Sequence, residues 1–227
     1  MLEEFAPSLY TADGPRVPFF GIPYPTRMAV ARLQDGSAWV WSPVALTPEL
    51  ARAVDAIGPV RHIVSPNKLH HLFLEEWAER YPDAQLYAPP GLAKRRPKIP
   101  FDAELGDSAP AAWADEIEQV IFRGSMSLEE VVFWHRPSRT AILCDLVQRH
   151  DPADFSGVKT LLLRLVGVVG EAGSTPREWK MTFLRRRPAR AARTKVLNWK
   201  PERLLIAHGE CAHQNATPIL ARALSWI

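Results

Sequence analysis

The residue types that could perform chemistry in this chain gather at the ends of three short apolar segments. His70 and His71 stand side by side after the segment that ends at Ser65, and Asp145 and His208 each follow a further apolar segment. Imidazole nitrogens and carboxylate oxygens are ligands that zinc, iron(II) and manganese accept in proteins. The sequence therefore predicts one metal site, built from these three histidines and one aspartate.

A metal ion at such a site would have a definite chemical use. Water on a divalent ion loses its proton near neutral pH and becomes a nucleophile, which is the basis of metal-dependent hydrolysis. The paired histidines set a condition, because adjacent side chains on a continuing helix diverge by about 100°. His70 and His71 can bind the same ion only if the turn that carries them is irregular.

Each candidate ligand also has a structural alternative. His70 could cap a helix or lie at the surface, and His71 precedes an apolar helix face and could be a buried core histidine. Asp145 could accept hydrogen bonds from the N–H groups of a turn. Cys144 and Cys211 flank candidate ligands, but a small buried thiol is the commoner role for such a residue.

The elements that must position these residues alternate between strands and helices. A β-hairpin is expected to turn at Asp35-Gly36, and Thr47-Pro48 supplies a cap and a first residue for a helix. The first half is predicted to contain strands over residues 28–33, 38–41, 60–65 and 85–88, and helices over 48–57 and 71–81. Residues 93–112, which are rich in proline and basic residues, are predicted to form a loop with at most a short helical turn.

The second half repeats this pattern. It is predicted to contain strands over 117–122, 130–135, 140–145 and 204–207. One helix is expected to begin near 175, a second to begin near 187 and end near 199, and a third to run over 217–226. His135 begins the turn of a hairpin, so a structural role is expected for it. Two such halves predict an α/β (α+β) sandwich with helices outside, in a single domain over residues 1–227.

Composition and charge restrict the classes of function. The chain has 227 residues, a net charge of +3, 47% hydrophobic and 23% charged residues, which are ordinary values for a globular protein. No apolar run reaches the roughly eighteen residues of a membrane span, and the acidic start is unlike a secretory signal, so a cytoplasmic protein without a membrane partner is expected. The basic run at 184–195 has no interleaved aromatic residues, which favours a solvated helix face over nucleic-acid binding.

Five phrases of the sequence carry a family resemblance. They are Tyr24-Pro25-Thr26-Arg27-Met28, Trp41-Ser42-Pro43-Val44, Ser65 to Phe73, Phe133 to Arg139, and Ala207-His208-Gly209-Glu210. In these phrases the chain resembles the metallo-β-lactamase superfamily and, within it, the family known as domain of unknown function 4336. The resemblance implies a four-layer αββα sandwich of metallo-β-lactamase type, with a metal site along one edge.

The metal motifs of that superfamily are only partly present. The motif His-x-His-x-Asp-His falls on the six residues that end at His71 and matches only there, with His70 in place of the aspartate. The next family histidine falls near Met126, whereas Asp145 matches the bridging aspartate and His208 the last histidine. The resemblance therefore implies a degenerate site for one metal ion rather than two.

Two hypotheses of different classes follow. The favoured one is a hydrolase-like protein that holds one zinc, iron or manganese ion and acts on a small-molecule ester, amide or phosphoester. The alternative is a non-catalytic, metal-free protein on the same fold that binds a small anionic ligand or a partner. In that case Lys68 would pair with Asp145 in place of the metal, and Lys94, Arg95 and Arg96 would join Lys68 in a basic rim. The sequence alone leaves catalysis and oligomeric state open.

Overall fold

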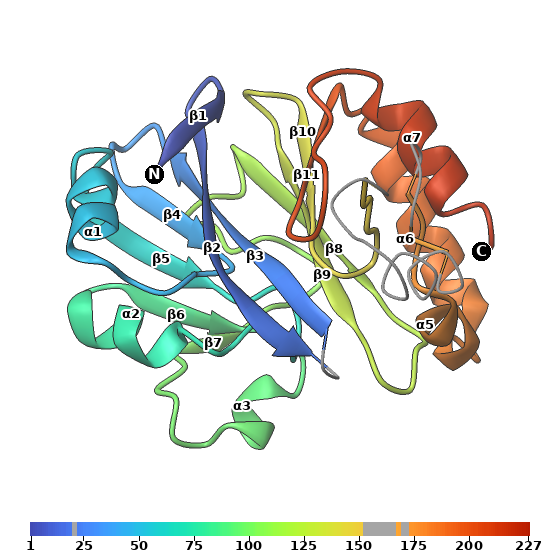
Figure 1. Ribbon diagram of the computed structural model, residues 1–227, viewed down its shortest axis with the longest axis horizontal. Coiled ribbons are helices and arrows are strands. Elements are labelled where there is room, and N and C mark those ends of the chain that lie inside the picture. The colour runs from blue at the N-terminus through green and yellow to red at the C-terminus, as the bar shows by residue number, and fades with distance from the viewer. Residues whose placement is uncertain (20–21, 152–166, 169–172) are drawn as a thin grey trace.

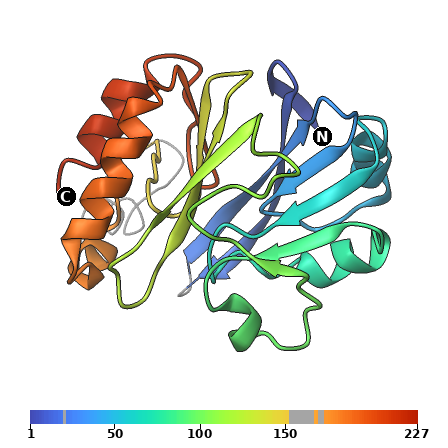
Figure 2. The same ribbon diagram turned by 180° about the vertical axis from the view of Figure 1, so that it is seen from behind.

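Two β-sheets pack face to face, and helices cover the outer face of each sheet (Figure 1, Figure 2). The structure is a computed structural model that describes residues 1–19, 22–151, 167–168 and 173–227. The four layers are the αββα arrangement that the sequence predicts.

The first sheet has seven strands among the described residues, in the order of the sequence. Neighbours from β1 to β4 are antiparallel, and those from β4 to β7 are parallel. The strands are β1 (Glu3–Ala6), β2 (Leu9–Phe19), β3 (Ile22–Arg32), β4 (Ala38–Trp41), β5 (Val60–Val64), β6 (Gln85–Ala88) and β7 (Ala103–Glu104). The parallel crossovers carry α1 (Pro48–Asp55), α2 (Leu74–Arg80) and α3 (Leu92–Arg95).

The second sheet has four strands among the described residues, in the order β11-β10-β9-β8. β8, β9 and β10 are antiparallel neighbours, whereas β11 runs parallel to β10. The strands are β8 (Ile117–Phe122), β9 (Glu130–His135), β10 (Thr140–Leu143) and β11 (Arg203–Ile206). The helices among the described residues of this half are α5 (Arg177–Thr182), α6 (Arg186–Asn198) and α7 (Ala216–Ala223), and α6 and α7 cover the outer face (Figure 1).

Large side chains fill the space between the sheets. Trp39 and Trp41 of β4 and Phe133 and Ile142 of the second sheet are all fully buried in one cluster. The rings of Trp39 and Phe133 meet edge to face with centroids 5.2 Å apart. Buried aromatic side chains contribute strongly to core stability, so this contact fixes one sheet against the other. The loops that follow β5, β10 and β11 are thereby held close together.

Two local signals of the first half are confirmed, the hairpin at Asp35 and the helix cap at Thr47. The hairpin turns at Asp35, whose carboxylate accepts the backbone N–H of Ser37 at 2.8 Å, and β3 and β4 pair as predicted. Helix α1 begins with Pro48, and the Thr47 hydroxyl accepts the N–H of Leu50 at 3.2 Å. Such a cap satisfies an N–H that would otherwise lack a partner in the first turn.

The histidine pair does not open a helix. The prediction placed a helix from His71, but α2 begins three residues later. The side chain of Asn67 accepts the N–H of Leu69 at 2.8 Å and that of His70 at 3.3 Å, which holds the chain in a turn of its own. The two histidines therefore lie in an irregular segment. Helix geometry does not force their side chains apart there.

Residues 93–112 are mostly loop, and the short helical turn allowed for there is the end of α3; the two-residue strand β7 was not predicted. Strand β2 contains prolines at positions 15 and 18. Strand β1 pairs with β2 only as far as Thr11, so beyond it one side of β2 has no strand neighbour among the described residues. Proline is tolerated on such an edge because no ladder hydrogen bond is lost.

The basic run forms the outer part of α6, as predicted. Ala189, Ala192 and Val196 are buried against the second sheet. The arginines at 185, 186, 187 and 190 are exposed. Lys195 forms an ion pair with Glu118 at 3.0 Å. No helix among the described residues is long and apolar enough to cross a membrane.

His135 is structural and gives the protein a dependence on pH. The ring is fully buried, its Nδ1 is 2.6 Å from the Ser138 hydroxyl, and burial lowers its pKa to about 4. An unfolded histidine titrates near pH 6.5, so the unfolded chain takes up this proton first as pH falls. The stabilisation is present above that pH and is lost as the pH falls toward 4. Between pH 7 and pH 5 we expect a loss of about 2 kcal/mol from this group.

The measurement is the free energy of unfolding in urea at both pH values, with a chelator present. The variant His135→Gln should lose about 2 kcal/mol less than the wild type over this interval. The matched control is His213→Gln, at an exposed histidine, which should keep the wild-type dependence. Equal pH dependence in wild type and His135→Gln would contradict the assignment.

Candidate metal centre

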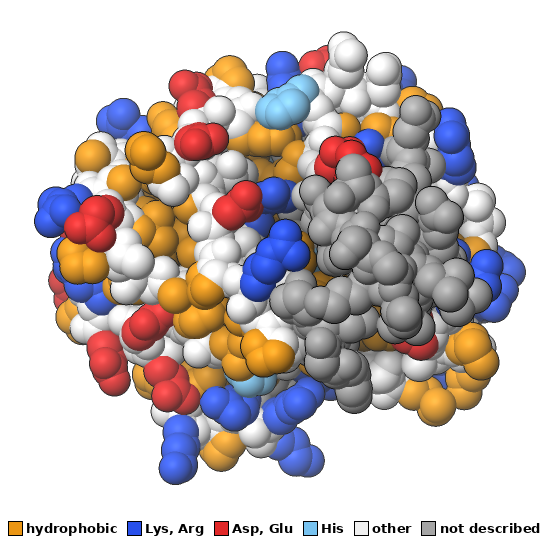
Figure 3. Space-filling view, in the orientation of Figure 1, with side chains coloured by type: hydrophobic (Ala, Val, Ile, Leu, Met, Phe, Trp, Pro, Cys, Tyr) orange, Lys and Arg blue, Asp and Glu red, His pale blue; other side chains and the backbone are white. Residues whose placement is uncertain are grey.

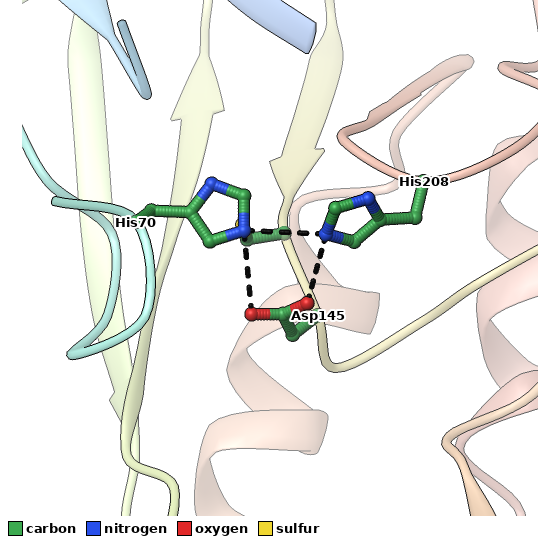
Figure 4. A group of neighbouring side chains, drawn as sticks. His70, Asp145 and His208 are labelled. Carbon is green, nitrogen blue, oxygen red and sulfur yellow. Dashed lines mark hydrogen bonds and ion pairs between the residues drawn. The ribbon is translucent and has the colours of Figure 1, made fainter. Parts of the chain in front are cut away.

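Side chains that follow three different strands meet at one point (Figure 4). His70 lies in the loop after β5, Asp145 lies just after β10, and His208 lies just after β11. The Nε2 atom of His208 is 2.9 Å from Asp145 Oδ1, and that of His70 is 3.4 Å from Asp145 Oδ2. The two Nε2 atoms are 3.2 Å apart. Ligand atoms of these residues and of Cys144 all lie within 4.8 Å of one another.

Both imidazole rings are held from behind at Nδ1. In His208 this atom is 2.8 Å from the carbonyl oxygen of Pro25, and because a carbonyl only accepts, Nδ1 must donate its proton there. In His70 the same atom is 2.8 Å from the Ser42 hydroxyl. Each ring is thus fixed so that Nε2 points toward Asp145.

This geometry fits a cation between the side chains. A neutral His208 that donates from Nδ1 carries a lone pair on Nε2, and that lone pair faces a carboxylate oxygen at 2.9 Å. Two lone pairs so close repel unless a proton or a metal ion lies between them. Two imidazole nitrogens and one carboxylate, with hydrogen bonds behind the rings, are typical of zinc, iron(II) and manganese sites. His70, Asp145 and His208 therefore fit one divalent ion.

A buried polar network holds Asp145 in place. The Asn67 amide donates to Asp145 Oδ2 at 2.8 Å and to Glu130 Oε2 at 3.2 Å. The Glu130 carboxylate accepts the backbone N–H groups of Cys144, Asp145 and Leu146 at 2.8, 2.7 and 2.9 Å. Glu130 thus fixes the turn that carries the aspartate, and Asn67 fixes the carboxylate itself.

Burial acts differently on the two carboxyl groups of this network. It raises the pKa of Glu130, and the charge of Asp145 raises it further against the backbone hydrogen bonds. Burial alone would raise the pKa of Asp145 too, but the imidazoles of His70 and His208 outweigh it and hold that pKa below its ordinary value. Asp145 is therefore the ionised member and the one suited to bind a cation.

His71 does not join the group. It lines the same pocket as His70, but none of its atoms belongs to the cluster of close ligand atoms. Its Nδ1 is buried without a hydrogen-bond partner among the described residues. Burial, followed by the charge of Arg96, lowers the pKa of its ring. Of the four ligands that the sequence predicts, the structure brings three together and leaves this one apart.

Lys68 and the basic residues around it also lie apart from Asp145. A side chain at Gly91 would lie 3.1 Å from Lys68 Cε, which places the lysine beside that glycine. The group that contacts Asp145 is the Asn67 amide. Lys and Arg side chains gather over α3 at the lower end of the view in Figure 3, and none of the predicted basic rim lines the pocket. Met126, where the superfamily has a histidine, is 77% exposed.

Sequence analysis missed most of the supporting network. Glu130 was not singled out, and Asn67 and Ser42 were named only as parts of family phrases. A signal did exist for Glu130, because it begins a strand whose next four residues are all apolar, and every residue of that strand is buried. A charged residue in such a strand needs a partner, and that requirement points to a polar network.

A pocket opens above the cluster, with a volume of about 250 Å³. His70, Asp145 and His208 all form part of its wall, whereas Cys144 does not. Tyr24 lies in the same wall, with its ring edge against His208 at a centroid distance of 5.4 Å. The three candidate ligands are therefore accessible to a small molecule, while the thiol lies beneath them.

Comparison with solved structures identifies the fold. The chain resembles the metallo-β-lactamase DIM-1 at 15% identity, over 99% of this chain and 96% of that chain, with a TM-score of 0.66. It resembles the metallo-β-lactamase FIM-1 from Pseudomonas aeruginosa in the mono-zinc form at 10% identity, over 99% and 94%, with a TM-score of 0.64. A flavo di-iron protein mutant from Thermotoga maritima matches at 12% identity and a TM-score of 0.64, over 99% of this chain and 60% of that chain.

The protein thus has the metallo-β-lactamase fold, as its sequence resemblance implied. Within that fold, the chain belongs to the family described as domain of unknown function (DUF4336), whose sequence model matches residues 18–153. A search of curated protein sequences gave no match.

Proposed function

We propose that the protein is a metal-dependent hydrolase that holds one divalent ion, zinc, iron(II) or manganese, with His70, Asp145 and His208. The observation that carries the proposal is the convergence of two Nε2 atoms and a carboxylate at the wall of a pocket, with both Nδ1 atoms already engaged. Three protein ligands leave a coordination position open, which is the feature that separates catalytic from structural metal sites.

The chain's own residues have distinct parts in this proposal. A bound divalent ion would supply an acidified water and would polarise a substrate carbonyl. The Pro25 carbonyl and the Ser42 hydroxyl keep the two imidazoles oriented. Burial, then Asp145 and Glu178, raise the pKa of Tyr24 to about 12, so its hydroxyl stays protonated. This hydroxyl donates to Gln148 Oε1 at 3.5 Å, and both residues belong to the pocket wall.

The solved relatives support the choice of metal chemistry and of stoichiometry. One similar structure is named as a mono-zinc form of a metallo-β-lactamase, and another as a di-iron protein. Proteins of this fold are thus named with zinc and with iron, and one of them with a single zinc ion. Among the described residues of this chain, one cluster of close ligand atoms is present, which is enough for a single ion.

The two adjacent histidines provide a matched pair of variants. In His70→Ala the metal content should fall from about one ion per chain to a small fraction, because one of three ligands is lost. His71→Ala should keep its metal, because His71 is outside the cluster. The measurement is elemental analysis of untagged protein purified without chelator, with circular dichroism to show that both variants fold.

Two results would contradict this assignment of ligands or the proposed function. Metal loss in His71→Ala but not in His70→Ala would support the ligand that the family motif indicates and would refute the assignment made from the geometry. Absence of metal in the wild type, with none taken up on titration, would refute the hydrolase proposal and favour a metal-free binding protein.

Cys144 decides whether the site is open or closed. Because the thiol is fully buried and lies outside the pocket wall, we expect it not to bind the ion. Protein loaded with cobalt(II) should then lack the near-ultraviolet charge-transfer band of a thiolate ligand, and Cys144→Ser should keep its metal. A thiolate band that disappears in Cys144→Ser would show four protein ligands, a closed site and no position for water.

A further inference from the structure

We infer that the pocket above the metal centre selects an uncharged acyl compound, such as a carboxylic ester with a short apolar acyl group, and rejects phosphoesters and other anions. The reaction itself rests on the proposed function, but the selectivity of the pocket does not and can be measured without metal. The sequence left ester, amide and phosphoester as alternatives, and the pocket wall favours the uncharged ester and amide over the phosphoester.

The wall of the pocket is largely apolar. Val17, Pro18, Pro43, Phe73 and Trp179 contribute to it, drawn from β2, the loop after β4, the segment before α2 and helix α5. Its volume of about 250 Å³ lies just below the range of roughly 300–1,000 Å³ that is usual for small-molecule sites. The space therefore suits a compact apolar group.

The charges on the wall are all of one sign. Among the described residues that line the pocket, Asp145 and Glu178 are the charged ones apart from histidines, and no lysine or arginine is present. A divalent ion together with these two carboxylates sums to zero net charge. An anionic substrate would thus gain no net attraction from the site, and its charge would lose hydration on entry.

The nearby basic side chains do not reverse this balance. Arg96 follows α3 and forms an ion pair with Glu75 at 3.8 Å, and Lys68 packs beside Gly91. Neither lines the pocket. Recognition of a phosphate or carboxylate commonly uses an arginine that can form two parallel hydrogen bonds, and the described wall offers none.

For an ester, the inferred reaction is a simple hydrolysis. The oxygen of water bonds to the acyl carbon and the acyl carbon–alkoxy oxygen bond breaks. One proton of the water ends on the alcohol, and the other is released when the carboxylic acid ionises. No oxidant, reductant or second substrate is needed.

The test of the pocket compares hexanamide with hexanoate, which have the same chain length and differ in charge. Binding to metal-free wild-type protein is measured by calorimetry with a chelator present, near pH 8, where hexanoate itself is ionised. We expect hexanamide to bind at least about tenfold more tightly. Glu178→Lys should tighten hexanoate binding by about fivefold and leave hexanamide nearly unchanged. The control Glu129→Gln, at an acid outside the pocket, should bind both as the wild type does.

Equal or tighter binding of hexanoate by the wild type, or no response of hexanoate to Glu178→Lys, would overturn the inference.

A second experiment uses the metal-loaded enzyme with p-nitrophenyl butyrate, mono-p-nitrophenyl succinate and bis-p-nitrophenyl phosphate. We expect kcat/KM to be highest for the butyrate by at least about 100-fold. Preference for the succinate or the phosphate would overturn the inference and leave the hydrolase proposal standing. Metal binding and a preference for hexanamide, without turnover of any ester, would refute the hydrolase proposal alone.

Discussion

In the variant Asp145→Asn we expect metal affinity to fall by at least about 100-fold, more than removal of any outer hydrogen bond would cause. The carboxylate is the anionic member of the proposed ligand set and lies within reach of both imidazoles. Asn67 already donates to Oδ2, so the new amide will keep its oxygen there and turn its NH2 group toward His208 Nε2. That hydrogen bond would occupy the lone pair that the metal requires.

The measurement is competition for zinc against a chelator of known affinity, with elemental analysis of the purified variant. The matched control is Glu178→Gln, which neutralises another acid of the same pocket outside the ligand cluster and should keep its metal. Because the variant satisfies the buried polar groups, its metal-free form should remain folded. Retention of wild-type affinity in Asp145→Asn would show that the ion, if bound, lies elsewhere.

Replacement of Glu130 should destabilise the protein more than any other single change at the site. In Glu130→Ala the backbone N–H groups of three successive residues and one N–H of Asn67 would lose their acceptor in a dry environment. Each unsatisfied buried donor costs about 1–3 kcal/mol, although water in the new cavity would recover part of that. We expect the free energy of unfolding to fall by about 3–5 kcal/mol.

The measurement is urea unfolding with a chelator present, so that any loss of metal does not contribute. Glu129→Ala is the matched control, because its neighbouring carboxylate is partly exposed and outside the network. The loss of stability in Glu130→Gln should lie between those of the two alanine variants. The glutamine keeps the shape of the side chain, but its NH2 group would face backbone or Asn67 N–H donors that the carboxylate now accepts. A change in Glu130→Ala no larger than in Glu129→Ala would show that the network contributes little to stability.

The sequence predicted the frame of the site better than its details. Asp145 and His208 could be found because each follows a short apolar strand, and the ends of neighbouring strands must lie together. The layers could be predicted because hairpins and strand-helix units alternate along the chain. These features depend on patterns of a few adjacent residues, which a single sequence displays.

The choice between His70 and His71 could not be made in the same way. It depends on the path of the backbone between Asn67 and α2, and a side-chain amide that accepts two N–H groups sets that path. The family motif favoured His71 as the matching histidine, but it assumes a backbone course that the Asn67 turn does not guarantee. Long-range hydrogen bonds such as those of Glu130 leave no periodic signal in the sequence.

The origin of the three candidate ligands links metal occupancy to the assembly of the whole domain. His70 comes from the first sheet, while Asp145 and His208 come from the second. Neither half of the chain holds the complete ligand set, so the ion would act as a bridge across the seam of the sandwich. An ion that binds only the native state adds about 2.7 kcal/mol of stability at a concentration one hundred times its Kd. The melting temperature would then rise with free metal concentration and would report how firmly the two sheets are joined.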